Sequence, residues 1–359
     1  MARATVKKIA MSQADIARMA GVDQSTVSYA LNNSTNISAE TRQRILEICQ
    51  KVNYQPNAHA RSLRQGNSDL IGVVTSPIRN LFQANLVDHI GANLRKVGYQ
   101  MCLRSLFNIQ TKQREQVLEL LDRRAAGVIV ETSHPALFSD LSDIIGRVMP
   151  LVIIGPTLEG ASSVSCDRYA AGRMAAEHLL SLGRRRLGIF YGSSRGQDGG
   201  PKADGFRSVA IEHKLEVVDI LLPEGAFPKV AEGAAPSAVD VGYAGAEILC
   251  KNRVNTDALF CTSDELAMGM VTGLREMGIQ VPSQIAIVGF DDIPQARYAA
   301  VPLTTIRQPI ADYASVAVQM LLSQLEHDSD FVRTSKSFSC NLIVRASTDI
   351  TWTPPRILT

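Results

Sequence analysis

The chain has 359 residues, of which 45% are hydrophobic and 20% charged, a composition typical of a soluble globular protein with a sizeable core. No run approaches the roughly 18 apolar residues of a membrane helix, and the basic start leads into polar residues rather than a signal sequence. The six cysteines lack C-x-x-C spacing and the six histidines never pair at ligand spacing, which argues against disulfides, metal or other cofactors. We expect a cytoplasmic protein with no membrane partner.

The positive charge of the chain is concentrated at its start. Residues 1–64 carry nine Lys or Arg against four acidic residues, whereas the remainder carries 28 basic and 31 acidic residues. Contact with phosphates releases counterions and requires such a concentration, while a neutral-to-acidic body does not bind DNA unspecifically. The first 64 residues are therefore predicted to bind nucleic acid.

Two short helices with a turn between them are predicted over residues 12–31. Ser12 lies three residues before Asp15, which is the spacing of a capping box at a helix start. Gly21 can adopt the left-handed conformation that ends a helix, and Asp23 precedes the second one. The apolar stripe of the first helix is formed by Ile16, Met19 and Ala20. This pattern is that of a helix-turn-helix.

The second helix presents hydrogen-bonding side chains of a size that suits the major groove. Val27 and Leu31 are four residues apart and are expected to face inward, so that residues 24–26, Ser28 and Tyr29 face outward. A third helix is expected from Ser38, with a stripe of Ile45, Ile48, Cys49 and Val52. An ordinary three-helix bundle with a polar outer face remains the alternative.

The run MSQADIARMAGVDQSTVSYALNNSTNISAETRQRILEICQKVNYQPNAHARSLRQG (11–66) resembles the head of the LacI/GalR family of bacterial transcription regulators. The resemblance continues to about residue 348. It implies a sequence-specific DNA-binding regulator, a repressor, which acts as a homodimer on a pseudo-palindromic operator and responds to a small-molecule effector. It also implies a small all-α helix-turn-helix domain, residues 1–55, and a hinge helix and linker, residues 56–68.

The resemblance implies a set of DNA contacts. The base-reading positions are Gln24, Ser25 and Tyr29. The phosphate contacts are Ser12, Thr26, Ser28, Asn32 and Ser38. Where this chain has Tyr29 the family usually carries Arg, which reads guanine in a bidentate manner, so the usual operator preference is not expected here.

The segment after Pro56 resembles the hinge helix of the same family. Proline suits the first turn of a helix, and the apolar edge of the segment includes Ala58, Ala60 and Leu63. In the family two such helices pack in the minor groove, with an apolar wedge between base pairs at the position of Leu63. The implied contacts are Asn57, Ala60 and Leu63. A flexible interdomain linker is the alternative, and the two readings are compatible if the helix forms only on DNA.

The body of the chain alternates apolar runs with amphipathic segments. Strands are expected at 70–74, 127–130, 151–154, 187–190, 258–260 and 285–288. Helices are expected at 84–97, 111–124, 168–182 and 264–277. Such alternation predicts parallel sheets covered by helices on both faces, with ligands bound at the carboxyl ends of the strands.

Residues 257–292 and 302–309 carry a resemblance to the type I periplasmic-binding-protein fold that the family uses as a sensor. The implied α/β domain, residues 69–348, has two lobes that close on an effector. The N-lobe is expected at about 69–167 and 303–330, and the C-lobe at about 168–302 and 331–348, so that the chain crosses near 167, 302 and 330. Residues 349–359 form a tail.

The resemblance also implies residues of the effector site. Asp264 matches a position where a carboxylate accepts hydrogen bonds from a ligand, although it could also begin a helix. Lys202 stands where the family generally has Arg, and Gly155 stands where sugar-binding relatives often have Asp. Asp167 lies at a lobe crossover, where it could either contact the ligand or brace the hinge. The remaining implied cleft residues are Ser76, Phe82, Glu131 and Gln308.

These departures from the family pattern favour a ligand with negative charge, such as a sugar phosphate or sugar acid, because one acceptor is lost while a lysine is kept. A neutral sugar remains an equal alternative. The chain offers no apolar heptads after residue 350, so a C-terminal coiled coil is not predicted.

Two other classes of protein remain to be weighed. Gly192-Ser193-Ser194-Arg195-Gly196 satisfies the G-x-S-x-G pattern of an α/β-hydrolase, with Asp291 and His327 in the required order, but a prolonged loop follows where the nucleophile elbow needs a helix. A transport-type binding protein requires export and has no use for a basic helical head. Neither class accounts for residues 1–64.

Overall fold

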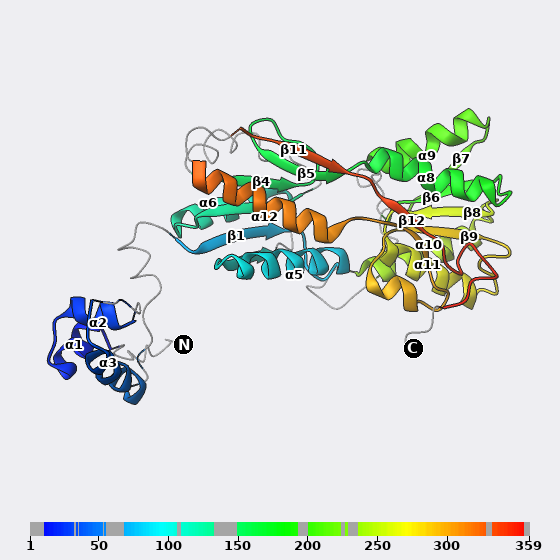
Figure 1. Ribbon diagram of the computed structural model, residues 1–359. Helices are drawn as coiled ribbons and strands as arrows, with labels where there is room; N and C mark the ends of the chain where they lie inside the picture. Colours follow the sequence, from blue (N-terminus) through cyan, green and yellow to red (C-terminus); the bar gives the residue numbers. More distant parts are fainter. Residues whose placement is uncertain are drawn as a thin grey trace. The chain divides into compact units, whose positions relative to one another are not determined.

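The computed structural model describes residues 11–31, 34, 36–52, 54, 68–105, 109–132, 149–192, 200–223, 227–228, 236–327 and 332–354. The chain divides into two compact units, residues 1–68 and residues 69–359 (Figure 1). Each unit is described by itself below. No helix of the described residues combines the length and apolarity needed to cross a membrane.

The first unit is a bundle of three helices. They are α1 (Gln13–Ala20), α2 (Gln24–Leu31) and α3 (Ala39–Lys51). The expected capping box is present, since Ser12 Oγ accepts from the amide of Asp15 and the Asp15 carboxylate accepts from the amide of Ser12. Gly21 ends α1 in the left-handed conformation with φ of 63°. The predicted helix-turn-helix is therefore confirmed.

The core of this bundle agrees with the predicted stripes except at one position. Ile16, Val27 and Ile45 are completely buried, and Ile48 and Val52 pack against the same cluster. Met19, which was expected in the stripe of α1, is 54% exposed, and its neighbour Ala17 is buried instead. An eight-residue helix has one narrow buried face, and the residue that follows Arg18 lies outside it.

The second unit contains two six-stranded sheets. The first has the order β11-β5-β4-β3-β1-β2 and the second the order β12-β10-β9-β8-β6-β7. All neighbours pair in parallel except β10 and β12. The strands of the first sheet are β1 (Leu70–Thr75), β2 (Gln100–Ser105), β3 (Gly127–Glu131), β4 (Leu151–Ile154), β5 (Ser162–Cys166) and β11 (Ser335–Phe338). Those of the second are β6 (Leu187–Phe190), β7 (Val217–Ile220), β8 (Ala258–Cys261), β9 (Ala286–Asp291), β10 (Thr304–Arg307) and β12 (Asn341–Ile343).

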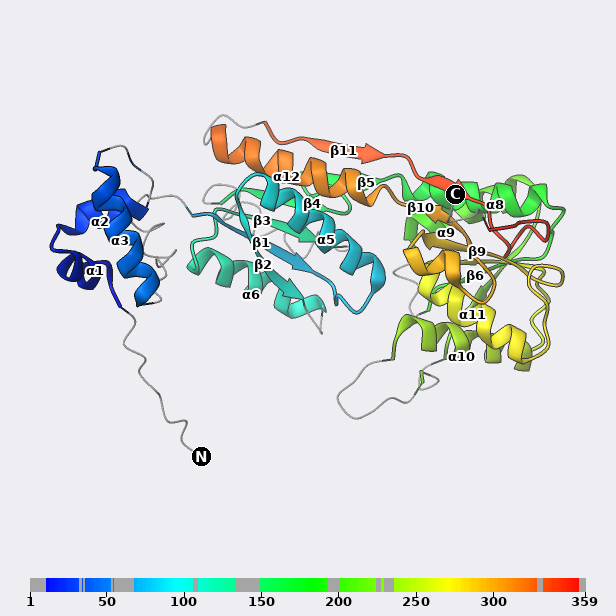
Figure 2. The ribbon, with the colours of Figure 1, turned by 60° about the horizontal axis from the view of Figure 1, so that its bottom comes forward.

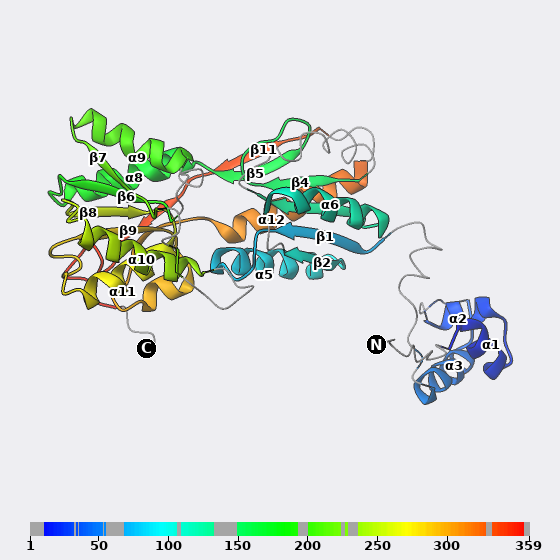
Figure 3. The ribbon, with the colours of Figure 1, turned by 180° about the vertical axis from the view of Figure 1, so that it is seen from behind.

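Helices cover both faces of each sheet (Figures 1, 2 and 3). On the first sheet, α5 (Leu81–Lys96) and α12 (Ile310–His327) pack on one face and α6 (Ile109–Asp122) on the other. On the second sheet, α8 (Arg168–Ser181) and α9 (Gly200–Glu212) pack on one face, and α10 (Ala238–Lys251) and α11 (Asp264–Glu276) on the other. A short 3₁₀ helix, η2 (Pro294–Tyr298), follows β9. The predicted α/β class with parallel sheets is confirmed.

The sheets correct the expected lobe boundaries. Strand β10 pairs with β9 and belongs to the second sheet, so residues 303–307 are not part of the first lobe. Strand β11 pairs with β5 in the first sheet, so residues 335–338 are not part of the second lobe. The chain passes between the sheets after Cys166, after Arg307 and after Phe338 rather than near 302 and 330. Strand pairing decides these positions, because a strand stays with its sheet until its last hydrogen-bonded residue.

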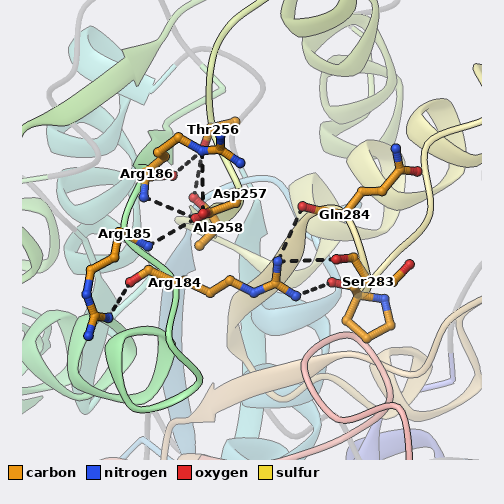
Figure 4. Close-up of polar contacts among 9 residues, drawn as sticks. Arg184, Arg185, Arg186, Thr256, Asp257, Ala258, Ser283 and Gln284 are labelled. Carbon is orange, nitrogen blue, oxygen red and sulfur yellow. Dashed lines mark hydrogen bonds and ion pairs between the residues drawn. The ribbon is translucent and has the colours of Figure 1, made fainter.

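Three consecutive arginines, Arg184 to Arg186, directly precede β6 and make polar contacts within the protein (Figure 4). Arg184 donates to the carbonyl oxygen of Pro282 over 2.5 Å and to that of Ser283 over 3.3 Å. The Asp257 carboxylate accepts from the amides of Arg185 and Arg186, at 3.3 and 3.1 Å. The Asp257 contacts join the start of β6 to the start of β8, and the Arg184 contacts join it to the segment before β9.

Candidate functional site

The first unit carries an exposed polar helix face on α2. Gln24, Ser25 and Tyr29 are exposed, and Thr26 and Ser28 are half-buried. Ser12 and Ser38 are both N-cap residues, whose hydroxyl oxygens accept from the amides of Asp15 and Thr41. The predicted contacts Asn32, Asn57, Ala60 and Leu63 lie outside the described residues. The exposed side chains of α2 are hydrogen-bonding groups of the kind that contact base edges and phosphates.

The second unit encloses a cavity of about 390 Å³ that is lined from both sheets. Its wall is formed at the carboxyl ends of β1, β3, β6, β8, β9 and β10, which is where parallel α/β sheets bind ligands. The lining residues are Ser76, Pro77, Arg79, Asn80, Phe82, Gln83, Glu131, Arg168, Tyr191, Gly192, Lys202, Pro236, Ser237, Ala238, Val241, Thr262, Ser263, Glu265, Leu266, Phe290, Asp291 and Gln308.

Five of the seven expected effector residues lie on this wall. They are Ser76, Phe82, Glu131, Lys202 and Gln308. Glu131 ends β3, and its Oε2 accepts from the Thr75 hydroxyl over 3.0 Å and from the Ser76 amide over 3.2 Å. These two donors hold the carboxylate at the strand end. The side chain is only 6% exposed, so it is oriented before any ligand arrives.

The ammonium group of Lys202 is held by the protein itself. Its Nζ donates to the carbonyl oxygen of Thr262 over 2.8 Å and lies 4.1 Å from the centre of the Phe290 ring. The side chain is 7% exposed. Lys202 is therefore a fixed part of the wall rather than a free cation that could clamp an anionic ligand.

Close contact between α8 and α9 positions this lysine. A Cβ added at Gly172 would lie 1.8 Å from the carbonyl oxygen of Lys202, and one added at Gly205 would lie 2.0 Å from that of Tyr169. Only glycine allows the two backbones to approach this closely. The two glycines thus set the separation between α8 and α9, the helix that carries Lys202.

Asp291 and Gln308 form a polar pair in the wall. Gln308 Nε2 donates to Asp291 Oδ1 over 2.6 Å. Burial raises the pKa of the Asp291 carboxyl to about 7, against the opposing effect of the Lys202 charge and the Gln308 hydrogen bond. The backbone at Asp291 has φ of 121° and that at Asp292 has φ of 55°, conformations that side chains rarely adopt. The strained turn directs the Asp291 carboxylate toward the cavity.

An ion-pair network holds the strained turn in place. The Asp292 carboxylate accepts from Arg345 over 2.6 Å and from Arg307 Nε over 2.5 Å. Arg345 also donates to the carbonyl oxygen of Leu303 over 2.8 Å. Because Asp292 is 6% exposed at its side chain, the loss of either arginine would leave a buried carboxylate without its full set of partners.

Two expected effector residues do not lie on the wall. Asp264 is completely buried beneath it, where its oxygens accept from the amide of Ile293 over 2.9 Å and from the hydroxyl of Thr305 over 2.5 Å. Burial raises the pKa of its carboxyl well above the ordinary value. Asp167 is exposed and caps α8, since its Oδ1 accepts from the amide of Ala170 over 2.8 Å. Both carboxylates fix local structure here, and neither lines the cavity.

The wall also contains charged and aromatic residues that the sequence analysis did not assign to the effector. Tyr191 directly follows β6 and Asp291 ends β9, so the rule that ligands bind at strand ends would have found both. Arg168 opens α8, and its guanidinium makes no hydrogen bond or ion pair with the described part of the chain. Glu265 Oε2 accepts from the amide of Leu81 over 3.3 Å and so connects α11 to the start of α5.

Family models match both units. The model of bacterial regulatory proteins of the lacI family matches residues 13–57, and that of a periplasmic binding protein-like domain matches residues 176–348. The HTH-type transcriptional regulator GalS of Salmonella typhimurium is 30% identical over 322 residues, which cover 89% of this chain and 92% of that protein. The HTH-type transcriptional repressor PurR of Haemophilus influenzae is 28% identical over 344 residues, or 93% of this chain and 97% of that protein.

Solved structures show the same fold. The Lac repressor dimer bound to operator and the anti-inducer ONPF has a TM-score of 0.78 at 21% identity, and the match covers 94% of this chain and 99% of that one. A LacI family transcriptional regulator from Enterococcus faecium with bound ribose has a TM-score of 0.65 at 24% identity, with 78% and 98% covered. The near-complete coverage by GalS, together with the match of the helical head, shows that the chain belongs to the lacI family of bacterial regulatory proteins.

Proposed function

We propose that the protein is a sequence-specific repressor that binds a pseudo-palindromic operator as a homodimer and is controlled by an effector in the cavity. The observation that carries the proposal is the presence in one chain of an exposed polar α2 and of a polar cavity at the strand ends of two sheets. One recognition helix covers only a few base pairs, so two copies are needed for useful specificity. The operator-bound Lac repressor is likewise a dimer.

Selection from a randomised duplex pool tests the DNA part of this proposal. Purified full-length protein should enrich a sequence with two related half-sites, and the affinity should fall steeply as salt is raised. Substitution Leu63→Ala should weaken binding to the enriched sequence and leave effector binding intact, since the wedge is proposed at the hinge. No enrichment at any salt concentration, with or without sugars, would overturn the proposal.

The cavity wall favours a neutral polyhydroxylated effector, a sugar, over an anionic one. The wall contains three basic residues, Arg79, Arg168 and Lys202, and three acidic ones, Glu131, Glu265 and Asp291. The lysine that suggested an anionic ligand already donates to Thr262. A volume of 390 Å³ lies within the range of about 300–1,000 Å³ usual for small-molecule sites.

Sugar complexes of structural neighbours agree with this choice. They include the regulator CelR with cellobiose, with a TM-score of 0.63, and a regulator from Alkaliphilus metalliredigens with D-xylulofuranose, with a TM-score of 0.65. A wall that contains both donors and acceptors suits hydroxyl groups, which act as both. The Glu131 carboxylate accepts, and the Arg168 guanidinium donates.

Calorimetry against a panel of neutral sugars and their phosphates tests the effector class. Neutral sugars are expected to bind, and the phosphorylated forms to bind more weakly, because the wall has no free excess of positive charge. Substitution Arg168→Gln should weaken the binding of the best sugar by about 1.5–3 kcal/mol, the effect of a charged hydrogen bond. Tighter binding of the phosphate would reverse the assignment of class.

Control of DNA binding would follow from a difference in effector affinity between two arrangements of the lobes. An effector that contacts residues of both sheets binds one arrangement of the lobes more tightly than another and so shifts their equilibrium. Ser76 and Glu131 come from the first sheet, and Asp291 and Gln308 adjoin the second. We propose that this shift determines whether the two heads of a dimer can engage the operator.

A regulator also offers another role for a residue of the hydrolase alternative. Asp291, which would orient a catalytic histidine, instead accepts from Gln308 in the cavity wall. Ser194 and the side chain of His327 lie outside the described residues. We propose that the protein performs no catalytic step and acts in the bacterial cytoplasm, where its operator is. Turnover of a p-nitrophenyl ester that is lost in Ser194→Ala would contradict this proposal.

A further inference from the structure

One buried oxygen in the wall of the cavity has no hydrogen-bond donor. It is Oε1 of Gln83, in the first turn of α5. Among the described residues of the second unit, it is the single enclosed side-chain oxygen or nitrogen that makes no hydrogen bond. Folded proteins rarely leave such a group unfilled, because burial removes its water without supplying another partner. This exception requires a physical explanation.

The other polar side chains around this turn already have partners in the protein. Asn80 caps α5, since its Oδ1 accepts from an amide of the first turn over 2.9 Å. Asn85 Nδ2 donates to the carbonyl oxygen of Leu81 over 2.8 Å. From the other lobe, Glu265 Oε2 accepts from the amide of Leu81 over 3.3 Å. The start of α5 is thus fixed without the Gln83 oxygen, so local structure does not explain why an amide is placed there.

Gln83 lies in a part of the wall to which both lobes contribute. Phe82 precedes it on α5, while Ser237 at the start of α10 and Glu265 on α11 line the cavity from the second lobe. The Ser237 hydroxyl does not serve Gln83, since it donates to the Asp240 carboxylate over 2.7 Å. Because Gln83 is itself a wall residue, a ligand that fills the cavity comes into contact with it.

We propose that Gln83 determines the specificity of the effector site, by accepting a hydrogen bond from one hydroxyl group of the sugar. This inference rests on the effector role proposed above and adds a residue that selects among sugars. A hydroxyl group is a suitable donor, because it needs no opposite charge beside the neutral amide and can also accept from the amide nitrogen. A sugar that lacks this hydroxyl leaves the oxygen unfilled and is bound more weakly.

An unfilled acceptor gives Gln83 opposite effects on stability and on binding. In the ligand-free protein the enclosed oxygen lowers the free energy of unfolding, whereas in the complex its hydrogen bond contributes to affinity. A side chain that served only local structure would lower both stability and affinity when it is replaced. The two measurements together therefore distinguish a ligand-selecting role from a structural one.

Substitution Gln83→Met tests the inference, since methionine is an unbranched side chain that lacks the amide. The melting temperature of the ligand-free, full-length protein should rise by about 2 °C or more, because the unfilled oxygen is removed. Calorimetry against a panel of D-hexoses and D-pentoses should show that the dissociation constant of the best sugar rises about 5- to 10-fold. A more stable protein with a weaker site is the expected outcome.

Monodeoxy forms of the best sugar identify the hydroxyl group that Gln83 selects. The wild type should bind one of these forms about 10-fold more weakly than the parent sugar, because that form leaves the Gln83 oxygen unfilled. Gln83→Met should bind the same form and the parent sugar about equally. The other deoxy forms should be discriminated alike by both proteins, so the comparison works as a double-mutant cycle between one side chain and one hydroxyl.

Asn93→Leu is the matched control, because it removes a side-chain amide from the same helix at a residue outside the cavity wall. It should change neither the affinity for the best sugar nor the preference among its deoxy forms. A lower melting temperature of ligand-free Gln83→Met, or an unchanged preference among the deoxy forms, would overturn the inference and leave the effector role intact. Failure of every sugar to bind the wild type would instead contradict the proposed effector class, and with it the selection by Gln83.

Discussion

Gln308 and Asp291 are joined by a hydrogen bond of 2.6 Å where two adjacent strands end, since Asp291 is the last residue of β9 and Gln308 directly follows β10. The bond lies in the wall of the cavity, where burial has already raised the pKa of the Asp291 carboxyl to about 7. The protonation state of Asp291 should therefore change with pH near neutrality.

Substitution Asp291→Asn should alter how stability depends on pH. The pKa of Asp291 is raised from 3.8 to about 7 on folding, so its contribution is fully present below pH 3.8 and is lost as the pH rises to about 7. Across that window the wild-type free energy of unfolding should fall relative to that of Asp291→Asn, by at most about 1.4 kcal/mol per pH unit. Urea unfolding at several pH values measures the difference.

Asparagine is the appropriate replacement, because it tolerates the positive φ of this position better than alanine does. Asp264 also has a raised pKa, of which the Asp291 charge is the second cause after burial, so Asp291→Asn should lower the pKa of Asp264 as well. Parallel curves for wild type and variant between pH 4 and pH 7 would show that Asp291 does not titrate there.

Substitution Thr305→Val should destabilise the second unit without removing a wall residue. The Thr305 hydroxyl donates to the buried Asp264 carboxylate, and its loss leaves an acceptor partly unsatisfied, at a cost of about 1–3 kcal/mol. Thr272→Val on the exposed face of α11 is the matched control and should change the free energy of unfolding by less than about 0.5 kcal/mol. Sugar affinity of Thr305→Val should remain close to that of the wild type, since Asp264 does not line the cavity. Loss of sugar affinity at unchanged stability would restore Asp264 to a direct ligand role.

Substitution Gly205→Ala should force α8 and α9 apart. The added Cβ would lie 2.0 Å from the carbonyl oxygen of Tyr169. The free energy of unfolding should therefore fall by about 1–3 kcal/mol or more. Sugar binding should weaken as well, because Lys202 lies on α9. Gly200→Ala in the same helix has no atom within 4 Å of its new Cβ and serves as the control. Equal effects of the two substitutions would show that close helix contact is unimportant.

Substitution Tyr29→Arg should change the base preference of the protein. Tyr29 is 41% exposed on α2, at a position that we propose reads bases, and arginine is a bidentate reader of guanine. The variant should select half-sites richer in guanine from a randomised pool. Met19→Arg adds the same charge at a residue of α1 that is 54% exposed, and should increase general affinity and salt dependence without a new base preference. An identical selected sequence for wild type and Tyr29→Arg would show that this side chain does not read bases.

The strands that were predicted from the sequence and those that were missed differ in their position within the sheets. The six predicted strands, β1, β3, β4, β6, β8 and β9, lie inside the sheets and are continuous apolar runs. All four edge strands, β2, β7, β11 and β12, were missed, because an edge needs no unbroken apolar run. The two other missed strands are buried but polar. Ser163 in β5 bonds to Ser335, and Thr305 in β10 bonds to Asp264, contacts that only the folded chain supplies.

The cavity wall, like the strands, could be predicted only in part from the sequence. The family resemblance placed Ser76 and Glu131 in the effector cleft, and both line the cavity at the ends of apolar strands. The burial of Asp264 was not predictable, since a carboxylate at the first turn of a helix can face the ligand or the neighbouring strand. Its direction is decided by Thr305 and Ile293, which are 41 and 29 residues away.

The arrangement of β11 and β12 has a consequence for synthesis of the protein. Both strands come from the last 25 residues of the chain, yet β11 closes one edge of the first sheet and β12 closes one edge of the second. Until residues 335–343 have left the ribosome, β5 and β10 expose unpaired backbone groups that can pair with another nascent chain. A translation product that stops before residue 335 should therefore aggregate through both lobes, and the two lobes should mature together rather than in order of synthesis.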